Sequence, residues 1–205
     1  MSKTKTFELN FDLLPTLKLG SMFAVLPAEV DSKLCAYKAT YDRAMGALTF
    51  SALLCNVPIK VDESGTKLRE AYLRAALGEF VSMEETIQLD DSNGMHPKIR
   101  DSQNPLLHMM KQLRNMQFHL SNSALTSHQQ NVEWGSQNSA MDLWYVEEID
   151  LTDFNKLHGA ANFSDSDKSK MIGWFNSNQK LWGINELILQ SVTLYAKELL
   201  AKKND

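Results

Sequence analysis

Residues 104–120 of the chain read NPLLHMMKQLRNMQFHL. Asn104 is a preferred residue just before a helix, and Pro105 fits the first helical position because its missing N–H would have no partner there. Apolar side chains then recur every three or four residues, which is typical of a helix that buries one face. These apolar residues are Leu106, Met110, Leu113, Met116 and Leu120. The stretch therefore predicts an amphipathic helix that starts at Asn104-Pro105.

Three other parts of the chain show the same helical spacing of apolar residues. They are residues 28–55, 66–90 and 168–202. A proline shortly after the first part and the run DDSNG at 90–94 predict where the first two helices stop. The third part contains residues that weaken helices, which favours two helices with a break near residue 178.

The segments between these helices are less regular. Residues 7–19 alternate loosely between apolar and polar side chains, which fits either a short strand or an arm lying on the core. Residues 121–139 are polar and are expected to form a loop. Residues 141–151 contain aromatic and β-branched side chains, and both a short strand and a packed turn of helix fit them.

Four or five amphipathic helices in one chain predict an all-α fold, an up-and-down helical bundle with minor irregular or short β additions. The chain has 205 residues, of which 43% are hydrophobic and 22% charged, and such a chain buries a sizeable core. No repeat or linker divides it. We therefore expect one soluble domain over residues 1–205, with an N-terminal arm and helix in 1–60 and a core bundle in 66–202.

Composition and charge exclude several classes of protein. The formal net charge of −4 and the pI of about 5.7 exclude a broadly basic protein that coats nucleic acid by charge alone. The two cysteines, Cys35 and Cys55, have no metal-ligand spacing and are expected to be free, buried thiols. No Gly-rich phosphate loop, signal peptide or membrane span is recognisable, which predicts a cytoplasmic protein without membrane attachment, metal or cofactor.

Residues 95–130 differ in charge from the rest of the chain. They contain four of the five histidines, and their basic residues face a single acid, Asp101. The basic residues are Lys98, Arg100, Lys111 and Arg114. A local positive field in an acidic protein favours an anionic ligand at this place.

Within this segment, residues 113–119 read LRNMQFH, near the end of the helix that is predicted from Asn104. The run resembles the signature of the HEPN superfamily (higher eukaryotes and prokaryotes nucleotide-binding), in which an arginine is commonly followed by a polar residue and, a few residues later, by a histidine. Arg114, Asn115 and His119 match those positions. The resemblance implies an all-helical bundle that is often dimeric and, in many members, a metal-independent endoribonuclease of toxins or anti-phage defence. An antitoxin or defence-system partner is implied with it.

The matching residues suit cleavage of RNA by its own 2′-OH. His119 has an ordinary pKa of about 6.5, so it is suited to proton transfer near neutrality. Arg114 stays charged and is suited to hold two phosphate oxygens. Asn115 is expected to orient His119, because residues four apart share a helix face. Lys111 and His108, about one turn before the motif, are expected to contact RNA.

The spacing of Arg114 and His119 raises a geometric question. Residues five apart differ by about 140° around a helix and by about 7.5 Å along it, so they do not point the same way. Either the long arginine curls toward the histidine, or two copies of the motif meet across a dimer axis. The resemblance favours the second arrangement, and we expect a homodimer that binds single-stranded RNA.

Other interpretations of the same residues stay open. A non-catalytic HEPN-like module would bind a nucleotide or a protein partner through Arg114 without cutting RNA. In a helical structural or regulatory protein, His119 would interact only with the helix dipole and Arg114 only with a surface carboxylate. Glu79, on the preceding predicted helix, either supports Arg114 or is an ordinary part-exposed residue.

Overall fold

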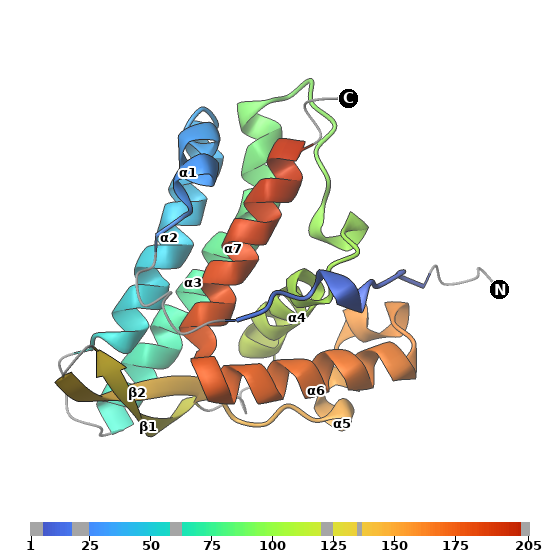
Figure 1. Ribbon diagram of the computed structural model, residues 1–205. Coiled ribbons are helices and arrows are strands. Elements are labelled where there is room, and N and C mark those ends of the chain that lie inside the picture. Colours follow the sequence, from blue (N-terminus) through green and yellow to red (C-terminus); the bar gives the residue numbers. More distant parts are fainter. Residues whose placement is uncertain (1–5, 18–24, 58–62, 120–124, 135–136, 202–205) are drawn as a thin grey trace.

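The computed structural model describes residues 6–17, 25–57, 63–119, 125–134 and 137–201 (Figure 1). These residues form mainly α-helices and one antiparallel pair of strands, which confirms the prediction of a mostly helical fold with minor β additions. The longer elements are α1 (Ala28–Leu34), α2 (Lys38–Cys55), α3 (Glu63–Asp90), α4 (Pro105–His119), β1 (Leu125–Trp134), β2 (Gln137–Val146), α5 (Leu151–Asn155), α6 (Asp165–Trp182) and α7 (Ile184–Ala201). Short 3-10 helices are η1 (Phe11–Leu13), η2 (Ile99–Asp101) and η3 (His158–Asn162).

Helices α2, α3 and α7 run side by side and enclose much of the core (Figure 1). α2 and α3 are neighbours along most of their length, and α7 packs against both. α4 packs against α3, α6 and α7, whereas α6 runs across the lower end of this group in the view of Figure 1. The buried apolar residues of these helices belong to one hydrophobic cluster within the described part of the chain.

The apolar spacing over residues 28–55 predicted one long helix, but the structure has two, because the chain leaves the helical path at residues 35–37. The carboxylate of Asp90, at the end of α3, accepts hydrogen bonds from Ala39 N (3.0 Å), Thr40 N (2.7 Å) and Thr40 Oγ1 (2.8 Å). Burial raises the pKa of Asp90, but these hydrogen bonds outweigh it and lower the pKa. The start of α2 is therefore capped by a distant residue, which no local pattern reveals.

The helical pattern over residues 168–202 is divided as predicted, but at Gly183 rather than near residue 178. Gly183 has a φ of 83°, a backbone conformation that glycine adopts far more easily than other residues. Asn178 stays inside α6, where its Nδ2 donates to the carbonyl oxygen of Trp174 (2.8 Å). A residue that weakens helices is thus accommodated by a local hydrogen bond, and the glycine sets the boundary.

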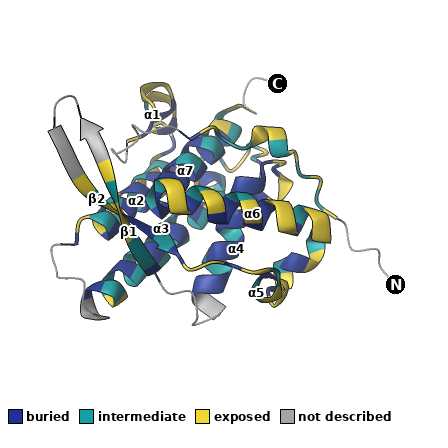
Figure 2. Ribbon diagram, turned by 60° about the horizontal axis from the view of Figure 1, so that its bottom comes forward, coloured by how far each residue is buried: buried dark blue, intermediate teal, exposed yellow. Residues whose placement is uncertain are grey.

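The polar segment predicted as a loop over residues 121–139 lies largely in a β-hairpin, so that prediction was wrong for its described residues. β1 and β2 pair from Leu125 opposite Val146 to Trp134 opposite Gln137. Among the described side chains, those at the base of the hairpin are buried and those further out are mostly exposed (Figure 2). Strands that are exposed on both faces carry polar residues, which is why their composition indicated a loop. Of the two interpretations of residues 141–151, the strand is correct up to Val146.

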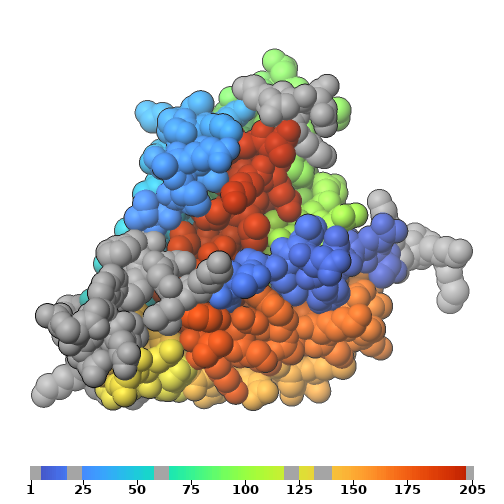
Figure 3. Space-filling model, in the orientation of Figure 1, coloured from blue at the N-terminus to red at the C-terminus, as the bar shows by residue number. Residues whose placement is uncertain are grey.

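Of the N-terminal segment, the structure describes residues 6–17. These residues form an arm that lies on the core and not a strand. Phe7 N donates to the carbonyl oxygen of Asn162 (2.8 Å), and Asn10 N donates to that of Gln103 (2.8 Å). The space-filling view shows the arm crossing the surface between α7 and α6 (Figure 3). The arm therefore covers the part of the core next to the start of α4.

Within the described residues, the helices are too short or too polar for any of them to cross a lipid bilayer.

Candidate functional site

The start of α4 is fixed by Asn104, as the sequence predicts. Its Oδ1 accepts a hydrogen bond from Leu106 N (2.9 Å), which satisfies one of the N–H groups left free in the first helical turn. Its Nδ2 donates to the carbonyl oxygen of Leu13 in the arm (2.9 Å). The side chain of Asn104 thus caps the start of α4 and also joins it to the N-terminal arm. These two hydrogen bonds fix the position of the start of α4.

Most of the surface of α4 is buried (Figure 2). Among the residues of this helix whose side chains are described, only Lys111, Arg114 and Asn115 are partly exposed. We call these three residues the α4 strip. His119 is the last residue of the helix, and its side chain lies outside the described part of the structure. The strip therefore contains both described members of the HEPN-like motif.

Arg114 and Asn115 contact each other on this strip. The Nη1 of Arg114 donates to the Oδ1 of Asn115 at 3.3 Å, and both residues are half-buried. Asn115 is thereby placed to hold Arg114. The expectation that Asn115 orients His119 stays a prediction.

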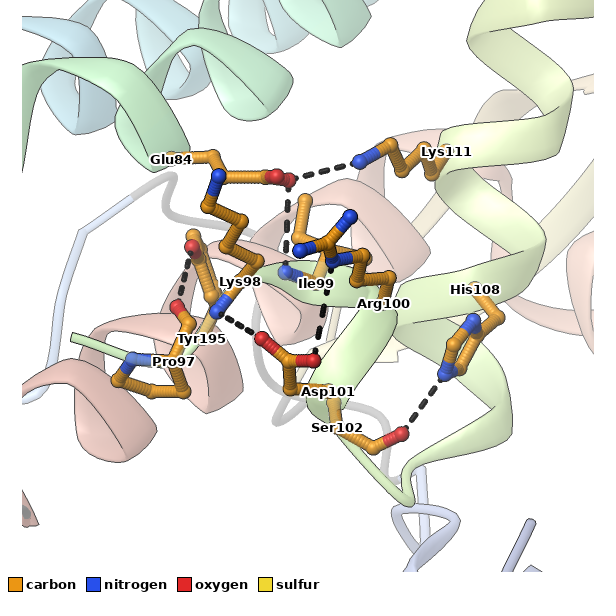
Figure 4. Close-up of polar contacts among 10 residues, drawn as sticks. All are labelled: Glu84, Pro97, Lys98, Ile99, Arg100, Asp101, Ser102, His108, Lys111 and Tyr195. Carbon is orange, nitrogen blue, oxygen red and sulfur yellow. Dashed lines mark hydrogen bonds and ion pairs between the residues drawn. The ribbon is translucent and has the colours of Figure 1, made fainter. Parts of the chain in front are cut away.

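Lys111 forms an ion pair with Glu84 on α3, with an Nζ to Oε2 distance of 2.7 Å. Glu84 also accepts a hydrogen bond from the backbone N–H of Ile99 in η2 (3.4 Å). Figure 4 shows Glu84 between these two donors. The side chain of Lys111 is 28% exposed, so it reaches solvent while its charge is partly balanced.

His108 does not lie on the α4 strip, contrary to the expectation that it contacts RNA. The residue is 2% exposed, and its Nε2 donates to the carbonyl oxygen of Ser102 at 2.7 Å (Figure 4). Its ring contacts those of Phe7 in the arm and Phe163, with centroid distances of 4.9 and 5.4 Å. Burial lowers the pKa of His108, although the hydrogen bond to Ser102 opposes this shift. The sequence could not show that the arm covers this side of α4.

Because His108 is buried, we expect the stability of the fold to depend on pH. The unfolded chain takes up a proton on this histidine near its ordinary pKa of about 6.5, whereas the folded chain takes it up only at lower pH. Neutral His108 therefore contributes fully to the free energy of unfolding above about pH 6.5. This contribution is lost as the pH falls below the ordinary pKa of histidine. We expect urea unfolding to give a free energy of unfolding that decreases from pH 7 to pH 5.

The control for this prediction is His108→Gln, which keeps an N–H donor for the carbonyl oxygen of Ser102 but does not titrate. Its free energy of unfolding should fall less steeply over the same pH range. Equal slopes for the two proteins would contradict the stated role of His108.

The basic side chains of residues 95–130 do not all lie at one place. Arg100 lines a hollow of about 770 Å³ beside the N-terminal arm, and its Nε lies 3.8 Å from Asp101. Lys111 pairs with Glu84 on α3 instead. The remaining lining residues of the hollow are Thr6, Phe7, Glu8, Asp101, Ser102, Gln103 and Asn162. The charge excess of the segment is therefore divided between η2 and the α4 strip.

Glu79 does not support Arg114. Its carboxylate binds Arg43 on α2, with an Oε2 to Nη1 distance of 2.9 Å. That interpretation of Glu79 was therefore wrong, because the residue lies on the side of α3 that faces α2.

Comparisons with known proteins find no relative: no family model, curated protein or solved structure matches the chain. Within the part of the chain that the structure describes, no group of three or more His, Cys, Asp or Glu side chains is placed to hold a metal ion.

Proposed function

We propose that this protein is a metal-independent endoribonuclease of the HEPN type, which cuts single-stranded RNA with Arg114, Asn115 and His119. The contact between Arg114 and Asn115 supports this most, because it holds a guanidinium on the partly exposed strip at the end of α4. His119 ends the same helix, about 7.5 Å further along its axis. A phosphate-binding group and a residue type suited to proton transfer thus share one helix end.

The proposed reaction uses the 2′-OH of RNA as the nucleophile. The 2′-oxygen bonds to the neighbouring phosphorus and gives its proton to one imidazole, while the bond from phosphorus to the 5′-oxygen breaks. The leaving 5′-oxygen takes a proton from a second imidazole, so the products are a 2′,3′-cyclic phosphate and a 5′-hydroxyl. Arg114 stabilises the negative charge that develops on the phosphate oxygens. The reaction balances without any metal or cofactor.

Two imidazoles are available when two chains pair. Residues five apart on one helix diverge by about 140°, so Arg114 and His119 of a single chain do not converge readily. A two-fold pairing of the α4 ends gives one cleft two copies of each residue. The active unit in this proposal is a cytoplasmic homodimer, with the toxin or anti-phage role, and the antitoxin or defence partner, that the HEPN resemblance implies.

The proposal is tested by incubating a single-stranded RNA in EDTA with the wild type and with His119→Ala. The matched control is His158→Ala, since His158 is exposed on η3. We expect cleavage by the wild type and the control, and a rate at least about a hundredfold lower for His119→Ala, because acid–base groups contribute roughly 10²–10⁴-fold. Equal cleavage by His119→Ala would contradict the proposal. Saturable binding of RNA by the wild type without products would favour the non-catalytic module instead.

A further inference from the structure

A hollow of about 470 Å³ lies between the β1–β2 hairpin and the end of α6. α6 packs against β2 and ends beside the hairpin (Figure 1), so the two walls of the hollow belong to elements in contact. The lining residues are His128 of β1, Tyr145 of β2, and Ser177, Lys180 and Leu181 of α6. We call this place the α6–hairpin hollow.

The hairpin wall of the hollow carries two neighbouring rings. His128 pairs with Leu143 and Tyr145 pairs with Thr126, so His128 and Tyr145 are diagonal neighbours on one face of the hairpin. Their ring centroids lie 5.5 Å apart, and the ring planes are inclined by 58°. His128 is exposed and Tyr145 is half-buried. Tyrosine and histidine rings at an open hollow suit a flat aromatic ligand, such as an unpaired nucleobase.

The α6 wall carries a hydroxyl, a cation and an apolar side chain. Ser177, Lys180 and Leu181 are three and four residues apart and share one side of the helix. Leu181 is 52% exposed, which is unusual for a large apolar residue of this protein. The Nζ of Lys180 lies 3.2 Å from Oε2 of Glu148, and both side chains are largely exposed. Such a surface ion pair is weak, so a phosphate can replace Glu148 as the partner of Lys180.

We propose that the α6–hairpin hollow binds one nucleotide, with its base against the rings of His128 and Tyr145 and its phosphate at Lys180 and Ser177. A nucleotide joins a flat ring to an anion, which is what the two walls together accept. Stacking on rings beside one cation binds any base with little preference. This inference goes beyond the proposed function, because the hollow holds a nucleotide whether or not the end of α4 cuts RNA.

The experiment measures binding of an uncleavable, fully 2′-O-methylated single-stranded RNA by fluorescence anisotropy at several salt concentrations. Tyr145→Leu removes a ring but keeps an apolar side chain, and we expect a Kd about tenfold higher with an unchanged salt slope. Lys180→Gln removes the cation, and we expect a salt slope smaller by about 0.7. Circular dichroism shows that both variants are folded.

The matched controls are a tyrosine and a lysine that do not line the hollow. Tyr72 is half-buried like Tyr145, and its ring centroid lies 6.3 Å from that of Phe50. Lys33 is exposed and paired with Glu29, much as Lys180 is paired with Glu148. For Tyr72→Leu and Lys33→Gln we expect less than about a twofold change in Kd.

Competition with adenosine monophosphate distinguishes a free nucleotide from a strand as the ligand. If excess adenosine monophosphate displaces the RNA from the wild type, a single nucleotide fills the hollow. If it does not, while Tyr145→Leu and Lys180→Gln weaken RNA binding as expected, the hollow takes a nucleotide of a strand. Variants that bind RNA like their controls, or a folded wild type that binds neither ligand, would overturn the inference.

Cleavage of an ordinary RNA in EDTA separates the two proposals. If the wild type binds RNA through Tyr145 and Lys180 but leaves it intact, the proposed function fails and the nucleotide site stands. If the wild type cuts RNA while both variants bind like their controls, the proposed function stands and the nucleotide site fails.

Discussion

Replacing Arg114 by glutamine is expected to lower the rate of RNA cleavage by about 10²–10³-fold, the usual effect of removing a group that stabilises charge in a transition state. The guanidinium carries a permanent charge and two parallel N–H groups that match two phosphate oxygens. Glutamine keeps an N–H donor but has a shorter side chain and no charge. The measurement is single-turnover cleavage in EDTA, with circular dichroism to show that the helices are retained.

Two further variants test whether the geometry at Arg114 matters as well as the charge. Arg114→Lys restores the charge without the planar group, so its rate should lie between those of the wild type and Arg114→Gln. Asn115→Ala removes the acceptor that Nη1 of Arg114 uses at 3.3 Å, and should cost about tenfold. A rate for Arg114→Gln equal to that of the wild type would show that Arg114 has no part in catalysis.

The largest expected effect on stability belongs to Gln179 of α6, which is 0% exposed. Its Oε1 accepts from the N–H of Val146 at 2.9 Å, and its Nε2 donates to the carbonyl oxygen of Val146 at 2.9 Å. Gln179→Leu removes both bonds and leaves two buried backbone groups without partners. We expect the free energy of unfolding in urea to fall by about 2–4 kcal/mol and Tm by roughly 4–16 °C.

The control for Gln179→Leu is Asn178→Leu on the same helix. Asn178 is half-buried and bonds only within α6, to the carbonyl oxygen of Trp174, as far as the described residues show. The Asn178→Leu substitution should change the free energy of unfolding by less than about 1 kcal/mol. Similar losses for the two variants would mean that the attachment of the hairpin to α6 does not depend on Gln179.

Helices and their ends could be predicted where the deciding interactions are local. The apolar stripe of residues 66–90 corresponds to α3, which ends at Asp90, where the turn-forming run begins. The start of α4 was correct because Asn104 bonds to Leu106, two residues away. In both cases, the residues that decide the boundary lie next to it in the sequence.

Features that depend on distant residues could not be predicted. The separation of α1 from α2 depends on Asp90, and the burial of His108 depends on Phe7 in the arm. The base of the hairpin rests on Arg69, which is 4% exposed and lies with its guanidinium carbon 4.1 Å from the ring centroid of Trp144. A buried arginine over an aromatic ring has no signal in the spacing of either residue.

The same distinction between local and distant interactions applies to the candidate site. The motif itself could be found in the sequence, since Arg114 and Asn115 are adjacent and their contact is local. The ion pair of Lys111 with Glu84 could not, because it depends on the packing of α3 on α4. The pairing of Glu79 with Arg43 likewise follows from the packing of α2 on α3.

The proposed function depends most directly on cleavage of RNA through the neighbouring 2′-OH at the end of α4. The most direct test compares two oligonucleotides in EDTA: an all-RNA strand, and the same strand with one 2′-deoxy nucleotide on the 5′ side of the bond that is cut. We expect the all-RNA strand to be cut to a 2′,3′-cyclic phosphate end and the deoxy-substituted strand to stay intact at that bond. Cleavage of the deoxy-substituted bond at a similar rate, or no cleavage of the all-RNA strand by the folded protein, would contradict it.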